Sequence, residues 1–288
     1  MIDLHTHSTA SDGSLSPEAL MREAAQAGIS AIALTDHDSI KGLDYARNEA
    51  GRQGIRLIPG IEIEINYPGP GHFHLLGLGI RAPSPGFVEA VEGLSLLREE
   101  RNLKILALMR DLGIEAGMEE LRDLARGEAR TSTGPGPSVG RPHFAALLVK
   151  RGMVKNQDLA FARYLGPGKP LYVPKPGLDF DRAQALVRES LGLPVLAHPL
   201  SLYLSWSRLR SFLAALKDRG LGGLEAWHPA AKVRDCRRLE GMARELGLRV
   251  TAGSDFHSGD QGGRRLGRSG GGRKIEDAVL EAIPELLD

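Results

Sequence analysis

Short apolar segments of this chain repeatedly end in histidine or acidic residues. Continuous apolar segments such as Ala31–Thr35 are typical of strands buried on both faces of a parallel sheet. In parallel α/β folds, side chains that follow the strands gather outside the carboxyl ends of the sheet. We therefore expect residues far apart in the sequence to converge on one site. These residues are His5 and His7, Asp36, His37 and Asp38, His198, His228, and Asp255 with His257.

Amphipathic helices separate the expected strands, which predicts an α/β fold with a parallel sheet or barrel. Ser16 and Pro17 are a typical helix start, and Gly28 is a typical end. A second helix is expected over Lys41–Gln53. The first strands are expected at Ile2–His5, Ala31–Thr35, Ile55–Ile58, Ile61–Ile65 and Phe73–Leu78, with a turn at Pro59 and Gly60. Later helices are expected at Phe180–Leu191, Arg208–Arg219, Val233–Leu246 and Glu276–Leu287, and later strands at Pro194–His198, Leu221–Trp227 and Arg249–Ala252.

The residues from 84 to 168 follow a different pattern. A long helix is expected over Pro85–Leu112 and a shorter one over Met118–Ala125. The loop Thr131–Gly140, rich in Gly, Pro and Ser, precedes a helix that opens at Arg141. We expect a barrel domain made of residues 1–83 and 169–288, with a helical insertion at 84–168 that caps the active site.

The bulk composition excludes several classes of protein. The net charge of +1 over 288 residues gives no global attraction to nucleic acid or to a membrane. The one cysteine, Cys236, allows no internal disulfide and fits a reducing compartment. The sequence has neither a signal-peptide pattern nor the roughly 20 apolar residues that span a bilayer. We expect a cytoplasmic protein with no membrane association and no obligatory protein partner.

All nine histidines lie in short clusters, and the clusters also contain carboxylates such as Asp12 and Glu62. Histidine is the commonest protein ligand for zinc-like metals, and carboxylates can bridge two ions. The concentration of both predicts a centre with several metal ions and hydrolysis by metal-activated water. His74 fits the pattern least well, because it lies early in its expected strand.

Seven segments, taken in order, resemble the PHP (polymerase and histidinol phosphatase) superfamily. They are DLHTHSTASDGSLSP, LTDHDSI, PGIEIE, HFHLLGL, GRPHFA, LAHP and GSDFHSG, and they extend over nearly the whole chain. Within the superfamily, the chain is most similar to the stand-alone nucleotide phosphatases. The resemblance implies a distorted (β/α)7 barrel with a trinuclear metal centre and a helical insertion over its mouth. It also implies removal of the 3′-phosphate from nucleoside 3′,5′-bisphosphates and, for some members, degradation of short RNA from the 5′ end.

The resemblance also implies which residues bind the three divalent ions. The first ion would be bound by His5, His7, Glu62 and Asp255. The second would be bound by Asp12, His37 and His257. The third would be bound by His74 and His198, with Glu62 bridging it to the first. Nitrogen ligands favour Mn, Fe or Zn over Mg or Ca, and manganese is the favoured candidate.

Three further residues are expected to act on the substrate. Arg141 and His143 open a helix whose free N–H groups attract anions, and Arg141 can bind a phosphate with two hydrogen bonds. The alternative is a surface arginine and a helix-capping histidine. His228 resembles a family position near the transferred phosphate, where a protonated ring would stabilise charge or donate a proton to the leaving ribose oxygen. The alternative for His228 is a structural role.

Other polar residues have two open interpretations each. His72 shares a strand face with His74 and is expected beside or at the rim of the ligand set, with metal ligation as the alternative. Asp38 is expected to orient a ligand imidazole, and Asp36 can equally accept hydrogen bonds from loop N–H groups. Four aromatic residues either stack on a base or lie in the core or at the rim, namely Tyr172, Tyr203, Trp206 and Trp227. The arginines at 262–273 either contact nucleic-acid phosphates or lie on a solvated surface loop.

The leading hypothesis is a metal-dependent phosphohydrolase acting on a small nucleotide. A metal-bound hydroxide would attack the 3′-phosphate of a nucleoside 3′,5′-bisphosphate and leave the 5′-monophosphate. The alternative is a 5′→3′ exonuclease on short RNA or DNA with the same centre, which an open channel would favour. Histidinol phosphatase and a non-catalytic metal-binding module are the remaining hypotheses.

Overall fold

The structure, a computed structural model, describes residues 1–69, 71–126, 136–258 and 264–287. The central sheet contains seven strands whose order in space is their order in the chain. They are β1 (Ile2–Asp3), β2 (Ala31–Leu34), β3 (Arg56–Ile65), β4 (Phe73–Leu78), β5 (Leu193–Leu196), β6 (Gly223–Trp227) and β7 (Arg249–Ala252).

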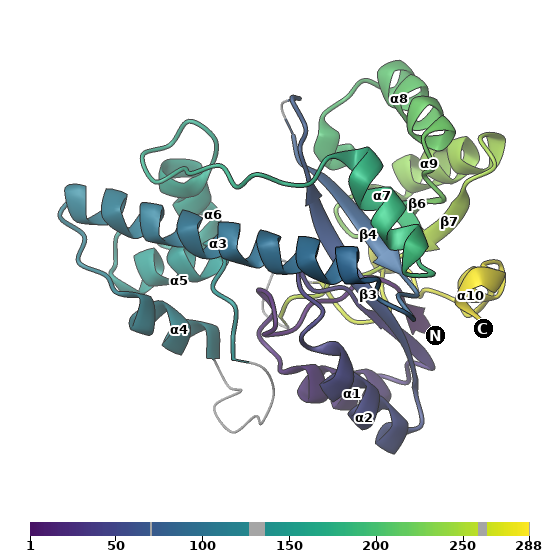
Figure 1. Cartoon of the computed structure of the whole chain (residues 1–288), viewed down its shortest axis with the longest axis horizontal. Helices are drawn as coiled ribbons and strands as arrows, with labels where there is room; N and C mark the ends of the chain where they lie inside the picture. The colour runs from purple at the N-terminus through teal and green to yellow at the C-terminus, as the bar shows by residue number, and fades with distance from the viewer. Residues whose placement is uncertain (70, 127–135, 259–263, 288) are drawn as a thin grey trace.

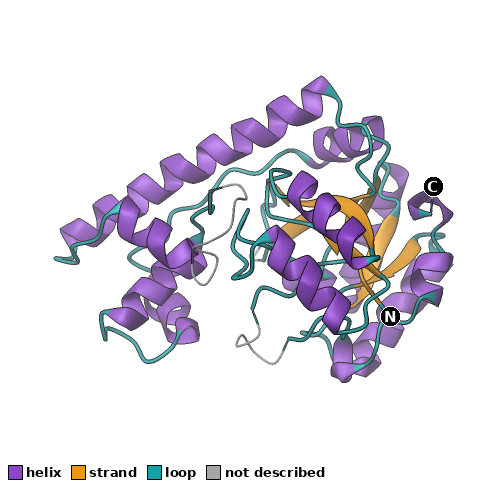
Figure 2. Ribbon diagram, turned by 90° about the horizontal axis from the view of Figure 1, so that it is seen from below, coloured by secondary structure: helices purple, strands orange, loops and turns teal. Residues whose placement is uncertain are grey.

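The two edges of the sheet meet, so that the sheet forms a nearly closed barrel. Beyond the ends of β1 and β7, the Asp255 N–H donates to the His5 carbonyl at 2.9 Å, and the His7 N–H donates to the Phe256 carbonyl at 2.9 Å. Thr6 and Phe256 form a parallel bridge between these segments. The predicted α/β fold with a distorted seven-stranded barrel is confirmed. Figure 2 shows the sheet enclosed by helices.

One strand of the barrel runs against the others. β4 pairs antiparallel with both β3 and β5, whereas the remaining neighbouring strands are parallel. The beginning of β4 therefore lies at the edge of the barrel where the parallel strands end. His74 lies there, opposite Glu64 of β3. The reversal of β4 explains why a residue early in its strand joins residues that follow the ends of others.

The turn predicted at Pro59 and Gly60 is wrong, because β3 continues through both residues. Pro59 pairs with Leu34 of β2, and its carbonyl accepts a hydrogen bond from Ile80 N–H. A side chain at Gly60 would lie 2.9 Å from Thr35 and 3.0 Å from the Gly77 carbonyl. Glycine thus serves close packing between strands at this position.

Helices cover the outside of the barrel. They are α1 (Pro17–Gln26), α2 (Leu43–Gln53), α7 (Phe180–Glu189), α8 (Trp206–Asp218), α9 (Val233–Glu245) and α10 (Ala278–Glu281). The predicted start of α1 is confirmed, since Ser16 Oγ accepts a hydrogen bond from Ala19 N–H at 3.1 Å. The last helix is shorter than predicted. Pro284 has no N–H to continue it, and a 3₁₀ turn over Pro284–Leu286 follows.

Between β4 and β5 the chain forms a group of helices beside the barrel. They are α3 (Pro85–Asp111), α4 (Met118–Arg126), α5 (Arg141–Lys150) and α6 (Gln157–Ala160), with a π-helical turn over Phe161–Leu165. The first half of α3 packs on the barrel core through Phe87 and Leu94. Its second half packs through Ile105 and Met109 into a separate apolar cluster with α4 and α5 (Figure 1). The domain boundaries at 84 and 168 stay a prediction, and residues 131–135 of the expected loop lie outside the described residues.

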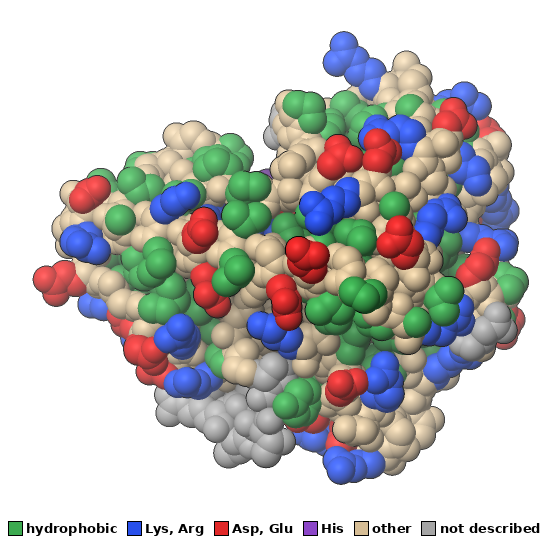
Figure 3. All heavy atoms as spheres, viewed as in Figure 1, with side chains coloured by type: hydrophobic (Ala, Val, Ile, Leu, Met, Phe, Trp, Pro, Cys, Tyr) green, Lys and Arg blue, Asp and Glu red, His purple; other side chains and the backbone are tan. Residues whose placement is uncertain are grey.

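The surface has no dominant charge on the face shown in Figure 3, where basic and acidic side chains are interspersed. This mixture agrees with the net charge of +1. None of the helices in the described part of the chain is long and apolar enough to span a membrane. The cytoplasmic location stays a prediction.

Candidate active site

Glu62, in the middle of β3, lies at the centre of the buried polar cluster. Its Oε2 is 3.3 Å from Nε2 of His5, 3.3 Å from Nε2 of His7 and 3.2 Å from Nδ1 of His37. Its Oε1 is 2.9 Å from Nδ1 of His74 and 2.9 Å from Nε2 of His198. The two oxygens of one carboxylate thus point at different groups of imidazoles, as a bridge between two ions requires.

The residues expected to bind the first ion lie together. His5 Nε2 and His7 Nε2 are 3.1 Å apart, and Asp255 Oδ1 is 3.5 Å from the former and 3.2 Å from the latter. The residues expected to bind the third ion also form a compact triangle. His74 Nδ1 and His198 Nε2 are 3.3 Å apart, and both are 2.9 Å from the same Glu62 oxygen.

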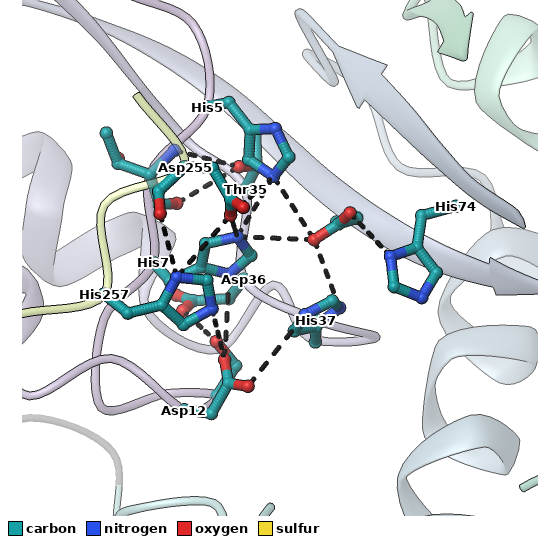
Figure 4. Close-up of polar contacts among 12 residues, drawn as sticks. His5, His7, Asp12, Thr35, Asp36, His37, His74, Asp255 and His257 are labelled. Carbon is teal, nitrogen blue, oxygen red and sulfur yellow. Dashed lines mark hydrogen bonds and ion pairs between the residues drawn. The ribbon is translucent and has the colours of Figure 1, made fainter. Parts of the chain in front are cut away.

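The residues expected to bind the second ion are more widely spaced. His257 Nε2 is 3.3 Å from Asp12 Oδ1, whereas His37 Nε2 is 3.9 Å from Asp12 Oδ2. His7 Nδ1 is also 3.9 Å from Asp12 Oδ1, so the ring of His7 lies between the first group and this one. Figure 4 shows the labelled histidines with Asp12 and Asp255 directed toward this common centre.

The donor atoms fit divalent ions. Ligands about 2.0–2.2 Å from one ion lie roughly 3.0–3.5 Å from each other, and the first and third groups have these spacings. Three buried atoms in the cluster have no hydrogen-bond partner among the described residues: His7 Nδ1, Asp12 Oδ1 and Glu62 Oε2. A buried polar atom without a partner is costly, and a cation would satisfy the two carboxylate oxygens. Imidazole and carboxylate donors suit Mn, Fe or Zn.

Outer contacts fix the orientation of the rings. Glu225 of β6 is fully buried; its Oε1 is 2.9 Å from His5 Nδ1, and its Oε2 accepts from the His198 N–H at 2.7 Å. His198 Nδ1 is 3.0 Å from Ser201 Oγ. These contacts direct the Nε2 atoms of both rings into the cluster, as partners of metal-binding histidines commonly do. Glu225 was not identified from the sequence. The signal available was a single acidic residue in an otherwise apolar strand.

The backbone is strained at the same place. Only five non-glycine residues of the described chain have positive φ, and Asp38, His198 and Asp255 are three of them, at 47°, 25° and 49°. Such conformations cost about 1–3 kcal/mol each and persist where the surrounding structure enforces them. The fold therefore holds these side chains in place at a conformational cost.

The charges within the cluster are strongly coupled. Burial alone would raise the pKa of Glu62, but His37, His5 and His74 hold it well below its usual range. Burial would lower the pKa of His74, but Glu62 and Glu64 raise it to about 10. Burial lowers the pKa of His37 to about 3. The carboxylates are thus ionised near neutral pH, and cation binding has to displace protons from imidazoles such as His74.

A cationic cavity adjoins the cluster. It has a volume of about 180 Å³ and is lined on one side by Asp12, His37 and His74. Its other lining residues include the carboxylate of Glu64 and four cationic side chains, Arg98, Arg101, Arg141 and Lys175, so that positive charge is in excess on this side. Three of the four belong to α3 and α5, so the helices beside the barrel contribute directly to a cavity that contains expected metal ligands.

Two of the four cations share one carboxylate. Arg98 Nη2 donates to Asp38 Oδ2 at 2.7 Å, and Lys175 Nζ donates to the same oxygen. Burial would raise the pKa of Asp38, but Lys175 and Arg98 lower it. Asp38 therefore contacts these cations, while the expected contact with an imidazole is not observed. Asp36 accepts hydrogen bonds from the Ser8 N–H at 2.7 Å and from two serine hydroxyls, as its alternative interpretation predicted.

Arg101 lacks a carboxylate partner among the described residues. The side chain is buried, its Nη2 donates to Asn102 Oδ1 at 2.8 Å, and its Nε has no hydrogen-bond partner. Burial and the neighbouring Arg98 and Arg141 lower the pKa of Arg101 to about 9, so that it still carries its charge at neutral pH. A buried guanidinium without an anion is unfavourable, and a phosphate group would supply the missing acceptor.

The residues predicted to act on the substrate have different surroundings. Arg141 lines the cationic cavity, and no hydrogen bond or ion pair of its side chain is found among the described residues. His143 lines a different cavity, and its Nδ1 accepts from the Gly140 N–H at 2.9 Å, which is the capping role that was its alternative; its role in substrate binding stays a prediction. His72 is half-buried, with its ring centroid 6.2 Å from that of His74.

His228 is buried beside Asp255. Its Nδ1 accepts from the Ala230 N–H at 3.2 Å, so the ring proton is on Nε2. Nε2 lies 3.1 Å from Asp255 Oδ2 and donates to it. This contact orients Asp255 so that Oδ1 faces His5 and His7. A role of His228 in positioning Asp255 follows directly, whereas its role as a proton donor stays a prediction.

The barrel and its buried cluster of imidazoles and carboxylates are those of a PHP-domain phosphoesterase. The PHP domain model matches residues 3–121, and the chain belongs to this family. The chain is 36% identical to a 5′-3′ exoribonuclease of Haemophilus influenzae, over 88% of this chain and 89% of the relative. It is 32% identical to a 3′,5′-nucleoside bisphosphate phosphatase of Chromobacterium violaceum, over 93% and 91%.

Two solved structures have the same architecture. An amidohydrolase from Chromobacterium violaceum with bound sulfate and no metal aligns with a TM-score of 0.83 at 29% identity, over 98% of this chain and 96% of that one. A structure from Bifidobacterium adolescentis, assigned as a metal-dependent phosphoesterase, aligns with a TM-score of 0.80 at 26% identity, over 99% and 96%. These likenesses cover the α3–α6 helices as well as the barrel.

Proposed function

We propose that this protein removes the 3′-phosphate from nucleoside 3′,5′-bisphosphates and leaves the 5′-monophosphate. The observation that carries this proposal is the cavity in which expected metal ligands share a wall with Arg98, Arg101, Arg141 and Lys175. A substrate with two phosphates fits a site with two adjacent regions for anions. The similarity to a bisphosphate phosphatase over most of both chains supports this substrate class.

Different residues would bind the two phosphates of the substrate. We propose three divalent ions, with manganese as the favoured metal, in the three ligand groups described above. These ions, when bound, would activate a water molecule and neutralise the oxygens of the 3′-phosphate. Arg101 and Arg141 would bind the 5′-phosphate, and Lys175 and Arg98 would contribute positive charge from their contact with Asp38. The burial of Arg101 would reduce the screening of its contact with the phosphate by water and strengthen that contact.

A second candidate function is 5′→3′ exonuclease activity on short RNA or DNA. The similarity to a 5′-3′ exoribonuclease, at 36% identity, favours it. A terminal nucleotide with a 5′-phosphate and a 3′-phosphodiester has the same two anionic groups as the bisphosphate. Histidinol phosphatase is less well supported, because histidinol phosphate has one phosphate and would leave the cationic cavity without an anion. A non-catalytic metal-binding role would leave the unpaired Arg101 without explanation.

A direct comparison of substrates tests the proposal. Purified protein with Mn²⁺ should release phosphate from adenosine 3′,5′-bisphosphate and leave the 5′-monophosphate, with a higher kcat/KM than for histidinol phosphate. A 5′-phosphorylated RNA 5-mer is the third substrate, and its cleavage would establish the second function. Absence of product from the bisphosphate and the 5-mer with Mn, Zn, Fe and Mg would refute the enzymatic proposal.

The role of His228 is tested by the dependence of the rate on the leaving group. The contact with Asp255 predicts that His228→Asn lowers kcat by about 100-fold with both adenosine bisphosphate and p-nitrophenyl phosphate, and lowers the metal content. A proton donor would matter far less for nitrophenolate, which leaves without protonation. A large loss with the bisphosphate alone, at full metal content, would therefore establish His228 as the acid.

A further inference from the structure

A second cavity meets the metal-ligand cluster on another side. It has a volume of about 450 Å³, and its lining includes His198, Tyr203, His228, Asp255 and Arg264. It shares no lining residue with the cationic cavity of Arg101. Because His198 and Asp255 are expected metal ligands, a group bound at the ions has access to both cavities. In the proposed function, the 5′-phosphate of the bisphosphate occupies only the smaller cavity, that of Arg101.

The second cavity continues along the surface into a third. The third cavity has a volume of about 490 Å³, and Arg264 lines both. Pro229 lies in its wall, directly after His228 of the second cavity. We call the two together the arginine groove. The third cavity is lined by Pro229, Arg264, Arg265, Arg268, Ser269, Gly271 and Gly272, so that its charged lining is entirely basic.

The arginines of the groove differ in how their charge is balanced. Arg264 Nη1 is 2.5 Å from Asp255 Oδ2. Arg268 Nη1 donates only to the Gly272 carbonyl, at 3.3 Å, and no ion pair of Arg265 or Arg268 is found in the described part of the chain. With a net charge of +1, the protein as a whole has no such excess. The positive charge is therefore local and lies where a polyanion would leave the metal cluster.

The lining of the second cavity includes an exposed aromatic residue. Tyr203 is 73% exposed and follows the 3₁₀ turn Pro199–Leu202, which begins directly after His198. Its φ of 52° is unusual for a residue with a large side chain. The groove thus combines an exposed tyrosine in one cavity with arginines in the next, and proteins bind single-stranded nucleic acid with bases on aromatic rings and phosphates on cations.

We propose that the arginine groove binds the part of a single-stranded oligonucleotide on the 3′ side of the scissile phosphate. The inference deepens the second candidate function, 5′→3′ exonuclease activity, and rests on it. The terminal 5′-phosphate would occupy the cavity of Arg101, the scissile phosphate would lie at the metal cluster, and the next base would stack on Tyr203. The following phosphates would contact Arg265 and Arg268. A bisphosphate would leave the groove empty.

The reaction on an oligonucleotide is balanced without a further reactant. Water adds to the scissile phosphorus, the bond from phosphorus to the ribose O3′ breaks, and O3′ takes a proton. The products are a 5′-mononucleotide and an oligonucleotide that is one residue shorter and again has a 5′-phosphate. That phosphate has to move from the metal cluster to the cavity of Arg101 before the next cycle, while the arginine groove retains the strand.

The double variant Arg265→Ala/Arg268→Ala tests the groove. We expect its kcat/KM for adenosine 3′,5′-bisphosphate to stay within about twofold of the wild type, because neither arginine contacts the cluster. For a 5′-phosphorylated RNA 8-mer, KM should rise about tenfold, and the slope of log KM against log salt should fall by about 0.7 for each lost phosphate contact. The control variant Arg47→Ala/Arg52→Ala removes the same charge from exposed positions on α2. It should change the kinetic constants for neither substrate.

Binding measurements separate the groove from the proposed chemistry. Anisotropy of a 3′-labelled, 5′-phosphorylated RNA 8-mer, in EDTA, should show weaker binding by the double variant and by Tyr203→Ala, but not by Tyr203→Phe. Single Arg265→Ala should give a smaller loss in the same direction. Equal affinity of wild type and all variants for the 8-mer would overturn the proposal that the groove binds oligonucleotides. Equal losses of kcat/KM with the 8-mer and the bisphosphate would also overturn it. Absence of hydrolysis of either substrate, with the binding difference retained, would overturn only the proposed function.

Discussion

Glu62→Gln is expected to lose at least about 10³-fold in kcat/KM for the bisphosphate. Both oxygens of Glu62 face imidazoles, Oε1 at 2.9 Å from His74 and His198 and Oε2 at 3.2–3.3 Å from three others. An amide has one neutral oxygen and cannot bridge two cations. The loss of several kcal/mol of charge stabilisation corresponds to three or more factors of ten in rate. Metal analysis should show that the variant retains fewer ions per chain.

Thermal unfolding gives a second measurement for the same variant. Mn²⁺ at 100 times its Kd should stabilise the wild type by about 2.7 kcal/mol, which corresponds to roughly 5–10 °C in Tm. The increase should be much smaller for Glu62→Gln. Glu49→Gln is the matched control, because Glu49 is also a buried carboxylate but contacts Arg52 and Gln53 on α2. Full metal content and activity in Glu62→Gln would refute the bridge.

Arg101→Met should impair substrate binding without destabilising the protein. Loss of charge-assisted hydrogen bonds to a phosphate, about 1.5–3 kcal/mol, should raise KM for the bisphosphate about 10- to 100-fold. Because the fold lowers the pKa of Arg101 to about 9, the charged form is disfavoured by folding. Its removal should therefore leave Tm unchanged or raise it. Methionine fills similar apolar volume.

The control for Arg101→Met is Arg110→Met, an exposed arginine on the same helix. It should change neither KM nor Tm. A KM near the wild-type value in Arg101→Met, or a fall in Tm by several degrees, would show that Arg101 has a structural role. A phosphate-binding role predicts a raised KM together with an unchanged or raised Tm. Binding sites often contain groups that destabilise the folded protein in the absence of ligand.

The strand-end pattern predicted most of the site, because in a parallel α/β fold the order of strands determines where their ends meet. The positions of His5, His37, His198 and Asp255 followed from this rule. The pattern could not place His74, since the direction of β4 depends on pairing with both β3 and β5. The turn predicted at Pro59 and Gly60 failed because local propensity was outweighed by the pairing of β3 across both residues.

The cationic residues of the site were harder to predict from the sequence than the expected metal ligands. Arg98 and Arg101 lie in the buried stripe of α3 between Leu94 and Ile105. A charged residue in such a stripe was the available signal. Lys175 belongs to an irregular segment, and only the folded chain places it beside Asp38. Local periodicity has no information on contacts of this kind.

Closure of the barrel between the segments after β1 and β7 also determines when the site can form. His5 and His7 precede Asp255 and His257 by about 250 residues, so they are synthesised well before them. The hydrogen bonds that join them connect residues about 250 positions apart, and contacts of such sequence separation slow folding because closing the loop costs entropy before they form. A chain that stops before Asp255 therefore lacks expected ligands of the first and second ions, so that complete metal loading would have to wait for the segment after β7.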